Sequence, residues 1–199
     1  MATKEDILEQ LVEEYLLHEG YFVRHNVKYK PRADHPDFEL NRDSNHSDID
    51  VIGYNPRKTG ADQVIVVSCK SWQGGFNPVN QLRNISEKRI VSGRDAWKGF
   101  RELVIPKWSK AFIDAVEDST GLREFTYVLA VTKVVGDKSV WESNPEFKNA
   151  LEGNPIKIID LRQMLVTIVP TLGTTLAGTE VGRMLQLFKA TGIEITART

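Results

Sequence analysis

Apolar side chains near the beginning of the chain recur at helical spacing. They are Ile7, Leu8, Leu11, Val12, Tyr15 and Leu16. Residues three, four and seven positions apart lie on one face of a helix, so this pattern predicts an amphipathic helix over residues 6–19. We expect Gly20 to end the helix, because glycine readily adopts the left-handed conformation that follows many helices.

Three short segments after this helix have the β-branched and aromatic content of strands. They cover residues 21–29, 48–54 and 63–70. The third segment is apolar at consecutive positions up to Ser68, which is typical of a central strand covered by helices on both faces. Residues 31–47 are polar and contain Pro, Asp, Asn and His, so we expect them to form a surface loop.

The remainder of the chain alternates between predicted helices and predicted strands. The helices begin at Pro78 and run towards Ile90, and cover 107–118, 161–168 and 179–190; the strands cover 125–135 and 156–160, with a helical turn at 145–151. This order of elements describes an α/β fold with a mixed central sheet flanked by helices. We expect residues 1–160 to form the core domain and residues 161–199 to form a C-terminal helical extension packed on it.

Composition narrows the class of protein. The 199 residues are enough to bury a sizeable core, and 41% hydrophobic with 27% charged residues excludes wholesale disorder. The apolar runs are too short to span a bilayer, and the N-terminus lacks the organisation of a signal peptide. The single cysteine, Cys69, excludes an internal disulfide framework and a cysteine-based zinc site. We therefore expect a cytoplasmic protein that does not associate with membranes.

The net charge of −1 excludes an extended basic coat, so contact with nucleic acid requires a local patch. The best candidate is a set of cationic residues interleaved with Trp97 and Phe100. It comprises Arg83, Lys88, Arg89, Arg94, Lys98 and Arg101. An ordinary charged helix with its apolar residues in the core is an equally good interpretation of this set.

Residues with the chemistry of phosphodiester cleavage lie on the second and third predicted strands. Ser68 and Lys70 are two positions apart, so their side chains leave the same face of the strand. If the two strands pair, Asp50 joins them at one edge of the sheet. Oxygen ligands bind Mg²⁺, which polarises a phosphoryl oxygen and lowers the pKa of bound water. A neighbouring lysine orients that water or offsets the charge that develops in the transition state.

These segments resemble the motif of the PD-(D/E)XK nuclease superfamily, which includes restriction endonucleases, archaeal Holliday-junction resolvases and Mrr-like enzymes. The matching segments are 47–53, SDIDVIG, and 64–72, VIVVSCKSW. The first helix is also similar, because Glu9 precedes a Gly20-Tyr21 turn into the first strand. The match covers roughly the first half of the chain, and the motif is short and degenerate. The resemblance implies a restriction-endonuclease-like fold.

The resemblance also implies roles for individual residues. Asp50 and the backbone carbonyl of Cys69 would bind Mg²⁺, for which Mn²⁺ would substitute, and Lys70 would position the water. Ser68 stands where the family usually has Glu or Asp, and a hydroxyl is a weaker ligand for Mg²⁺ than a carboxylate. The missing acid would come either from Glu9 on the first helix or from Glu87 on the helix after Lys70.

The same comparison suggests how the substrate is held. Gln73, Gln81 and Arg83 are expected to contact it, and Asp48 is either a second ligand or a solvated neighbour of Asp50. The expected function is a metal-dependent endonuclease that hydrolyses phosphodiester bonds in DNA. A homodimer could form through residues 161–168 or through the final helix. The alternative, motivated by Ser68, is a catalytically inactive nuclease-fold module that binds DNA or a protein partner.

Overall fold

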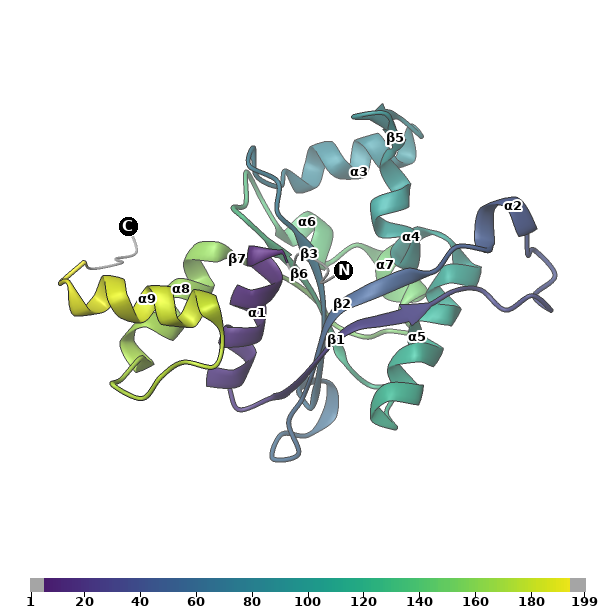
Figure 1. The fold of residues 1–199 in the computed structure, drawn as a ribbon. Helices are drawn as coiled ribbons and strands as arrows, with labels where there is room; N and C mark the ends of the chain where they lie inside the picture. The colour runs from purple at the N-terminus through teal and green to yellow at the C-terminus, as the bar shows by residue number, and fades with distance from the viewer. Residues whose placement is uncertain (1–5, 194–199) are drawn as a thin grey trace.

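A computed structural model describes residues 6–193 and contains a five-stranded mixed sheet in the order β1-β2-β3-β6-β7 (Figure 1). Strands β1 (Phe22–Tyr29), β2 (Ser47–Tyr54) and β3 (Val64–Lys70) pair antiparallel. Strands β6 (Thr126–Val131) and β7 (Ile156–Asp160) continue the sheet parallel to β3. The prediction of an α/β fold with a mixed sheet flanked by helices is therefore confirmed.

The central strands β3 and β6 are buried on both faces, which the continuous apolar sequence before Ser68 predicted for β3. In β3, Val64 and Val66 are fully buried and Val67 is 2% exposed. All six residues of β6 are buried. Side chains alternate across a strand, so a strand that is apolar at successive positions needs a layer of helices on each side of the sheet.

One face of the sheet is covered by helices from both ends of the chain. These are α1 (Ile7–His18), α8 (Leu161–Thr171) and α9 (Glu180–Ala190), seen together on the left of Figure 1. Asp6 begins α1, because its carboxylate accepts the Leu8 N–H at 2.8 Å. Leu11 of α1 and Met164 of α8 belong to one hydrophobic cluster that also includes sheet residues. The described part of the predicted extension, up to residue 193, therefore packs on the core as part of this layer, and residues 194–199 lie outside the described residues, as do residues 1–5.

The other face carries the helices between β3 and β7. They are α3 (Pro78–Ser86), α4 (Arg101–Val104), α5 (Pro106–Thr120), α6 (Ser139–Glu142) and α7 (Pro145–Ala150). Proline occupies the first turn of α3, α5 and α7, where its missing N–H costs no hydrogen bond. Packed aromatic rings of Phe76, Phe100 and Trp141 fill the space beneath these helices.

Several short elements differ from the predictions. The helix predicted from Pro78 towards Ile90 ends at Ser86, and a hairpin of β4 (Ile90–Val91) and β5 (Arg94–Asp95) follows it. A 3₁₀ helix, η2 (Ala96–Phe100), then leads into α4, and another, η1 (Gly60–Asp62), precedes β3. Within the predicted loop 31–47 lies the single helical turn α2 (Leu40–Asp43), before β2 begins at Ser47. Elements of two to five residues are too short to show a hydrophobic period.

The helices of the described chain are short or amphipathic. Among residues 6–193, none combines the length and the apolar composition needed to cross a membrane.

Candidate active site where β2 and β3 separate

Strands β2 and β3 part at the residues that carry the candidate chemistry. Their last paired residues are Val51 and Val67, so the next position outward places Asp50 opposite Ser68. There the Asp50 side chain replaces a ladder bond, because its Oδ2 accepts the Cys69 N–H at 2.6 Å. Meanwhile β2 stays paired with β1, and β3 stays paired with β6. The separation opens a polar gap at the sheet edge without breaking the sheet.

The side chains predicted to converge do line one small pocket. Its volume is about 140 Å³, and Asp48, Asp50, Ser68 and Lys70 all contribute to its wall. Within it the Lys70 ammonium donates to Ser68 Oγ at 2.9 Å. The Ser68 hydroxyl thus helps to fix the position of the Lys70 ammonium.

Asp50 lies in a partly desolvated position. Burial raises the pKa of its carboxyl above the ordinary value, while Lys70 and the Cys69 N–H act in the opposite direction, and Asp48 raises it further. The net pKa is raised, so the cation and the hydrogen bond do not fully compensate for burial. A further positive charge beside Asp50 would favour its ionised form.

A second buried carboxylate faces the same pocket, and sequence reasoning missed it. Glu102 of α4 is 5% exposed and lines the pocket with Asp50 and Lys70. Its Oε1 accepts the Tyr127 hydroxyl at 2.7 Å, and Tyr29 Oη lies 3.5 Å from its Oε2. Burial raises the pKa of Glu102, whereas Lys70 and the Tyr127 hydrogen bond lower it. Glu102 is therefore a further acidic group in the wall of the pocket that contains Asp50 and Lys70.

Glu9, the first candidate for that acid, belongs to the opposite face of the sheet. The Cys69 side chain packs in the cluster under α1, and burial, followed by the charges of Asp50 and Glu9, raises the pKa of the Cys69 thiol. Glu9 is thus near the end of β3 but is not among the described residues that line the pocket. Asp6, at the start of α1, also reaches this end, where it accepts the Ser71 hydroxyl at 2.8 Å.

Glu87, the second candidate, lies at the C-terminal end of α3. Its Oε2 accepts Arg89 Nε at 2.6 Å, and both side chains are about half exposed. Glu87 is likewise outside the set of described residues that line the pocket.

The three predicted substrate contacts occupy different environments. Gln73 is exposed in the turn that follows β3, and Arg83 is exposed on α3, where it donates to Asn80 Oδ1 at 3.1 Å. Gln81 is 9% exposed, on the packed side of α3. Two of the three are therefore on the surface near the end of β3, and the third is largely withdrawn from it.

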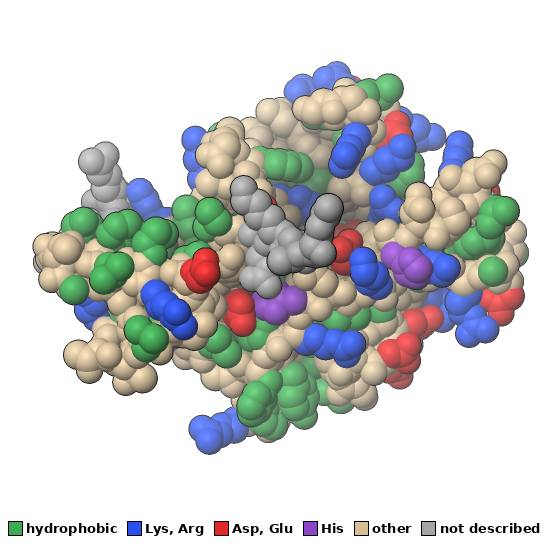
Figure 2. Space-filling model, viewed as in Figure 1, with side chains coloured by type: hydrophobic (Ala, Val, Ile, Leu, Met, Phe, Trp, Pro, Cys, Tyr) green, Lys and Arg blue, Asp and Glu red, His purple; other side chains and the backbone are tan. Residues whose placement is uncertain are grey.

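The predicted cationic patch contains both surface and core residues. Phe100 is fully buried, and the Arg101 guanidinium stacks on Trp108 at 4.5 Å. Lys98 contributes to the wall of the Asp50 pocket. Lys and Arg side chains gather over α3 and the β4–β5 hairpin, at the top of the view in Figure 2. The patch is therefore local and adjoins the pocket.

No family model, curated protein or solved structure matches the chain.

The donor set suits a hard cation that keeps part of its hydration. Among residues 6–193, no group of three or more His, Cys, Asp or Glu side chains could hold a metal ion. Mg²⁺ is commonly bound by one or two carboxylates together with waters and substrate phosphates. Asp50, the Cys69 carbonyl and Glu102 fit that pattern, whereas they do not form a closed all-protein cage.

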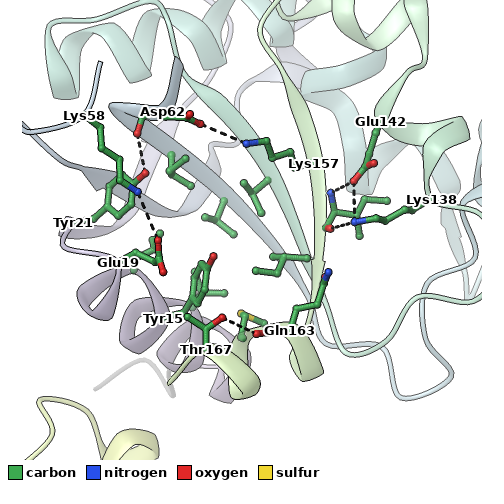
Figure 3. A pocket seen from close by; sticks show the side chains of 18 residues that line it. Tyr15, Glu19, Tyr21, Lys58, Asp62, Lys138, Glu142, Lys157, Gln163 and Thr167 are labelled. Carbon is green, nitrogen blue, oxygen red and sulfur yellow. Dashed lines mark hydrogen bonds and ion pairs between the residues drawn. The ribbon is translucent and has the colours of Figure 1, made fainter. Parts of the chain in front are cut away.

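A larger cavity, with a volume of about 650 Å³, lies elsewhere, on the sheet face next to α1 and α8 (Figure 3). Its floor is apolar and includes Val128 and Met164. Three lysines at its rim each lie near a carboxylate, in the pairs Lys58–Glu19, Lys138–Glu142 and Lys157–Asp62. With its charges matched, this cavity lacks the uncompensated carboxylates found around Asp50.

Proposed function

We propose that the protein is a metal-dependent endonuclease of restriction-endonuclease-like fold that hydrolyses phosphodiester bonds in DNA. The observation that carries the proposal is the separation of β2 from β3 at Asp50. It brings the Asp50 carboxylate and the Lys70 ammonium to one polar pocket at the end of these strands, beside the Cys69 backbone. These are the groups that metal-assisted attack of water on a phosphate requires.

The metal would be held by Asp50, the Cys69 carbonyl and Glu102. The N–H and C=O of one strand residue face the same neighbouring strand, so the Cys69 carbonyl faces β2 as its N–H does. Mg²⁺ or Mn²⁺ bound there supplies Lewis-acid polarisation of the phosphate and lowers the pKa of water. The raised pKa values of Asp50 and Glu102 support the assignment, because both carboxylates gain from an added cation.

Lys70 would orient the attacking water and offset negative charge on the phosphate. Its ammonium is positioned by Ser68 and lies 5.8 Å from the centre of the Phe100 ring. A lysine held between a hydroxyl and an aromatic face has fewer conformations to lose when substrate binds. Ser68 is then a positioning residue for Lys70.

Plasmid and linear DNA incubated with the protein and Mg²⁺ or Mn²⁺ test the proposal. We expect cleavage by the unaltered protein and a loss of at least about a hundredfold in Asp50→Asn and Lys70→Ala, the usual scale for removing a catalytic group. Glu87→Gln, a change at an exposed acid outside the pocket, is the matched control and should cut normally. Cleavage that survives both site substitutions would refute the site.

A catalytically inactive module that binds DNA or a protein partner remains the second candidate. It is favoured by the Lys70–Ser68 hydrogen bond, which ties up both side chains, and by the lack of a third acidic ligand among the described residues. Calorimetry with Mn²⁺ separates the two functions. Heat of binding that disappears in Asp50→Asn supports the enzyme, and no heat of binding with unaltered protein supports the inactive module.

We propose that any homodimer forms through α9 and not through α8. Met164 and Ile168 of α8 are fully buried in the core, whereas Leu187 of α9 is 68% exposed and Met184 is 44% exposed. Apolar side chains are visible over this end of the molecule in Figure 2. Sedimentation velocity should show a dimer that Leu187→Glu dissociates, and a monomer at all concentrations would contradict the proposal.

A further inference from the structure

The hairpin that follows α3 is a well-defined structure that projects from the molecule (Figure 1). Helix α3 ends in a Schellman motif, in which the Lys88 N–H bonds to Ile85 O at 3.1 Å and the Arg89 N–H bonds to Asn84 O at 2.9 Å. Ser92 and Gly93 then form the two-residue turn, with φ of 50° and 77°. Positive φ at both positions is the type I′ geometry that matches the twist of paired strands.

The hairpin exposes apolar side chains. Ile90 is 72% exposed and Val91 is 44% exposed, and two-residue strands bury too little surface to be stabilised by their own core. A backbone hydrogen bond from Ala96 N–H to Arg89 O, 2.9 Å, closes the base of the hairpin. The hairpin therefore exposes two branched side chains to solvent on a short structure whose base is closed by a hydrogen bond.

Positive charge surrounds this apolar pair. Lys88 precedes it and Arg94 follows it, and neither has an ion-pair partner within 4 Å among the described residues. Lys88 also has φ of 51°, a left-handed conformation that glycine adopts more easily.

The hairpin is continuous with the wall of the candidate site. Strand β5 leads directly into η2, and Lys98 and Gly99 of η2 line the pocket that contains Asp50. Lys98 is also tied back to Asp95 of β5 at 2.9 Å. A substrate long enough to extend from the pocket along this wall would meet the hairpin.

We propose that the β4–β5 hairpin contacts duplex DNA beside the cleavage site and inserts Ile90, the more exposed of its two apolar side chains, at a base step. The choice of DNA as the occupant rests on the proposed function and on the positive charge around the apolar pair. A two-stranded ribbon fits a DNA groove, branched apolar side chains unstack base steps, and Lys88 and Arg94 would each contact a phosphate. With a net charge of −1 for the chain, attraction to DNA depends on such local cations.

The test measures binding without cleavage, in EDTA. A short fluorescein-labelled duplex reports affinity by anisotropy, and the same duplex with 2-aminopurine reports unstacking of a base. We expect Arg94→Ala to weaken binding and to reduce the slope of log affinity against log salt by about one. Ile90→Ala should weaken binding about tenfold, as loss of one buried apolar contact predicts, and should remove the rise in 2-aminopurine fluorescence.

Matched controls come from the opposite end of the sheet. Phe22 is 71% exposed at the start of β1, and Arg57 is exposed in the turn after β2. Phe22→Ala and Arg57→Ala should bind like the unaltered protein. Because Ile90 and Arg94 are exposed, their variants should also keep the thermal unfolding temperature of the unaltered protein, which shows that they are folded.

The outcomes separate this proposal from the proposed function. Hairpin variants that bind like unaltered protein overturn the hairpin contact, whether or not the protein cleaves DNA. Hairpin variants that lose affinity while the unaltered protein never cleaves support the contact and overturn the nuclease. If neither the unaltered protein nor any variant binds the duplex, the contact is overturned. It is also overturned if Ile90→Ala loses self-association with unchanged DNA affinity, which would assign the hairpin to a protein contact.

Discussion

At the residue scale, the candidate site places two carboxylates, the half-buried Asp50 and the buried Glu102, in one pocket with the Lys70 ammonium. Asp50 and Glu102 both line the pocket of Lys70, and burial raises the pKa of each carboxyl. Placing more acids than bases in a partly desolvated pocket destabilises the folded state. Such an arrangement is typical of functional sites, where pKa values are perturbed for a chemical task.

Glu102→Gln should change how stability depends on pH. Because the folded pKa of Glu102 is raised above its ordinary value of 4.5, the native state binds more protons than the unfolded state in that window, and stability falls as pH rises through it. Glutamine does not titrate, so the Glu102→Gln variant does not lose this stability as pH rises. Its free energy of unfolding minus that of the unaltered protein should therefore be larger at pH 8 than at pH 4. Urea unfolding at both pH values checks this.

The same variant distinguishes a structural acid from a metal ligand. Mn²⁺ should stabilise the unaltered protein more than Glu102→Gln, because a neutral amide is a poorer ligand for a hard cation. An equal stability gap at both pH values would contradict the buried, ionisable position of Glu102. An equal effect of Mn²⁺ on both proteins would show that Glu102 is not a metal ligand.

Some of these residues could be predicted from the sequence and others could not. Ser68 and Lys70 share a face because side chains alternate along a strand, and Asp50 was placed beside them by assuming that the two strands pair. Glu102 lies on a helix of four residues, which is too short to show a period. Its approach to Lys70 depends on tertiary packing. The one local signal is an acid placed directly before an apolar run.

At the scale of elements, a buried ion pair anchors residues 30–46, the arm between β1 and β2 that contains α2. Asp43 is 2% exposed, and its carboxylate lies 2.7 Å from Lys107 Nζ and accepts Trp108 Nε1–H at 3.1 Å. Burial raises the pKa of Asp43, but Lys107 and the hydrogen bonds outweigh it and the net pKa is lowered. The arm is thereby fixed to α5.

Asp43→Ala should therefore destabilise the protein by about 2–3 kcal/mol at neutral pH, because it leaves Lys107 without its buried partner. The pKa of Asp43 is lowered from 3.8, so its contribution is complete above that value and is lost as pH falls through the lowered pKa. Urea denaturation should show the difference narrowing in acid. A constant difference down to acid pH would mean that packing, not charge, fixes the arm.

Gly182 of α9 allows close contact with α1. A Cβ at this position would lie 2.6 Å from the Glu14 carboxyl carbon and 2.7 Å from Ala177 Cβ. The Glu14 carboxylate is itself fixed, because it accepts the Thr179 hydroxyl at 2.7 Å. Gly182→Ala should destabilise the protein by about 1–2 kcal/mol despite the higher helix propensity of alanine.

Thermal or urea unfolding measures this change, with Gly173→Ala as the control. A Cβ at Gly173 meets nothing within 4 Å, so its stability should stay within about 0.5 kcal/mol of the unaltered protein. If Gly182→Ala proved neutral or stabilising, α9 would not be packed this closely on α1.

Long elements were predictable and short ones were not. The predicted helix at 179–190 is α9, with Thr179 as its cap, and the predicted helix at 107–118 lies within α5. The β4–β5 hairpin was missed, although Ser92-Gly93 is a recognisable turn. Its flanking strands have two residues each, so nothing in their alternation distinguishes them from the end of a helix.

At the scale of the whole molecule, residues after 160 complete the hydrophobic core. Met164, Ile168, Leu172, Val181 and Leu185 are all at most 7% exposed and cluster with α1 and the sheet. A chain that ends at residue 160 should lose cooperative unfolding, because each buried side chain contributes roughly 1.5–3 kcal/mol and an ordinary domain has about 5–15 kcal/mol in total. A calorimetric trace without a sharp transition, together with binding of a hydrophobic dye, is the expected result.

A sharp unfolding transition for residues 1–160 would instead show that the C-terminal helices are dispensable. The sequence pattern predicted that these helices pack on the core, but it did not show that α8 and α9 share a layer with α1. Hydrophobic periodicity indicates which side chains are buried and not which elements they meet. The strand order β1-β2-β3-β6-β7 was unpredictable for the same reason.

The two halves of the sheet differ in how far apart their paired residues lie along the chain. Val51 pairs with Val67 in the antiparallel half, whereas Ser68 pairs with Leu129 in the parallel half. Distant pairings close long loops and form slowly. A newly synthesised chain should therefore pair β1, β2 and β3 first. Asp50 would then be in place before β6 joins the sheet and brings Tyr127 beside Glu102. The complete pocket around Asp50 would then form only with the slowest kinetic phase of folding.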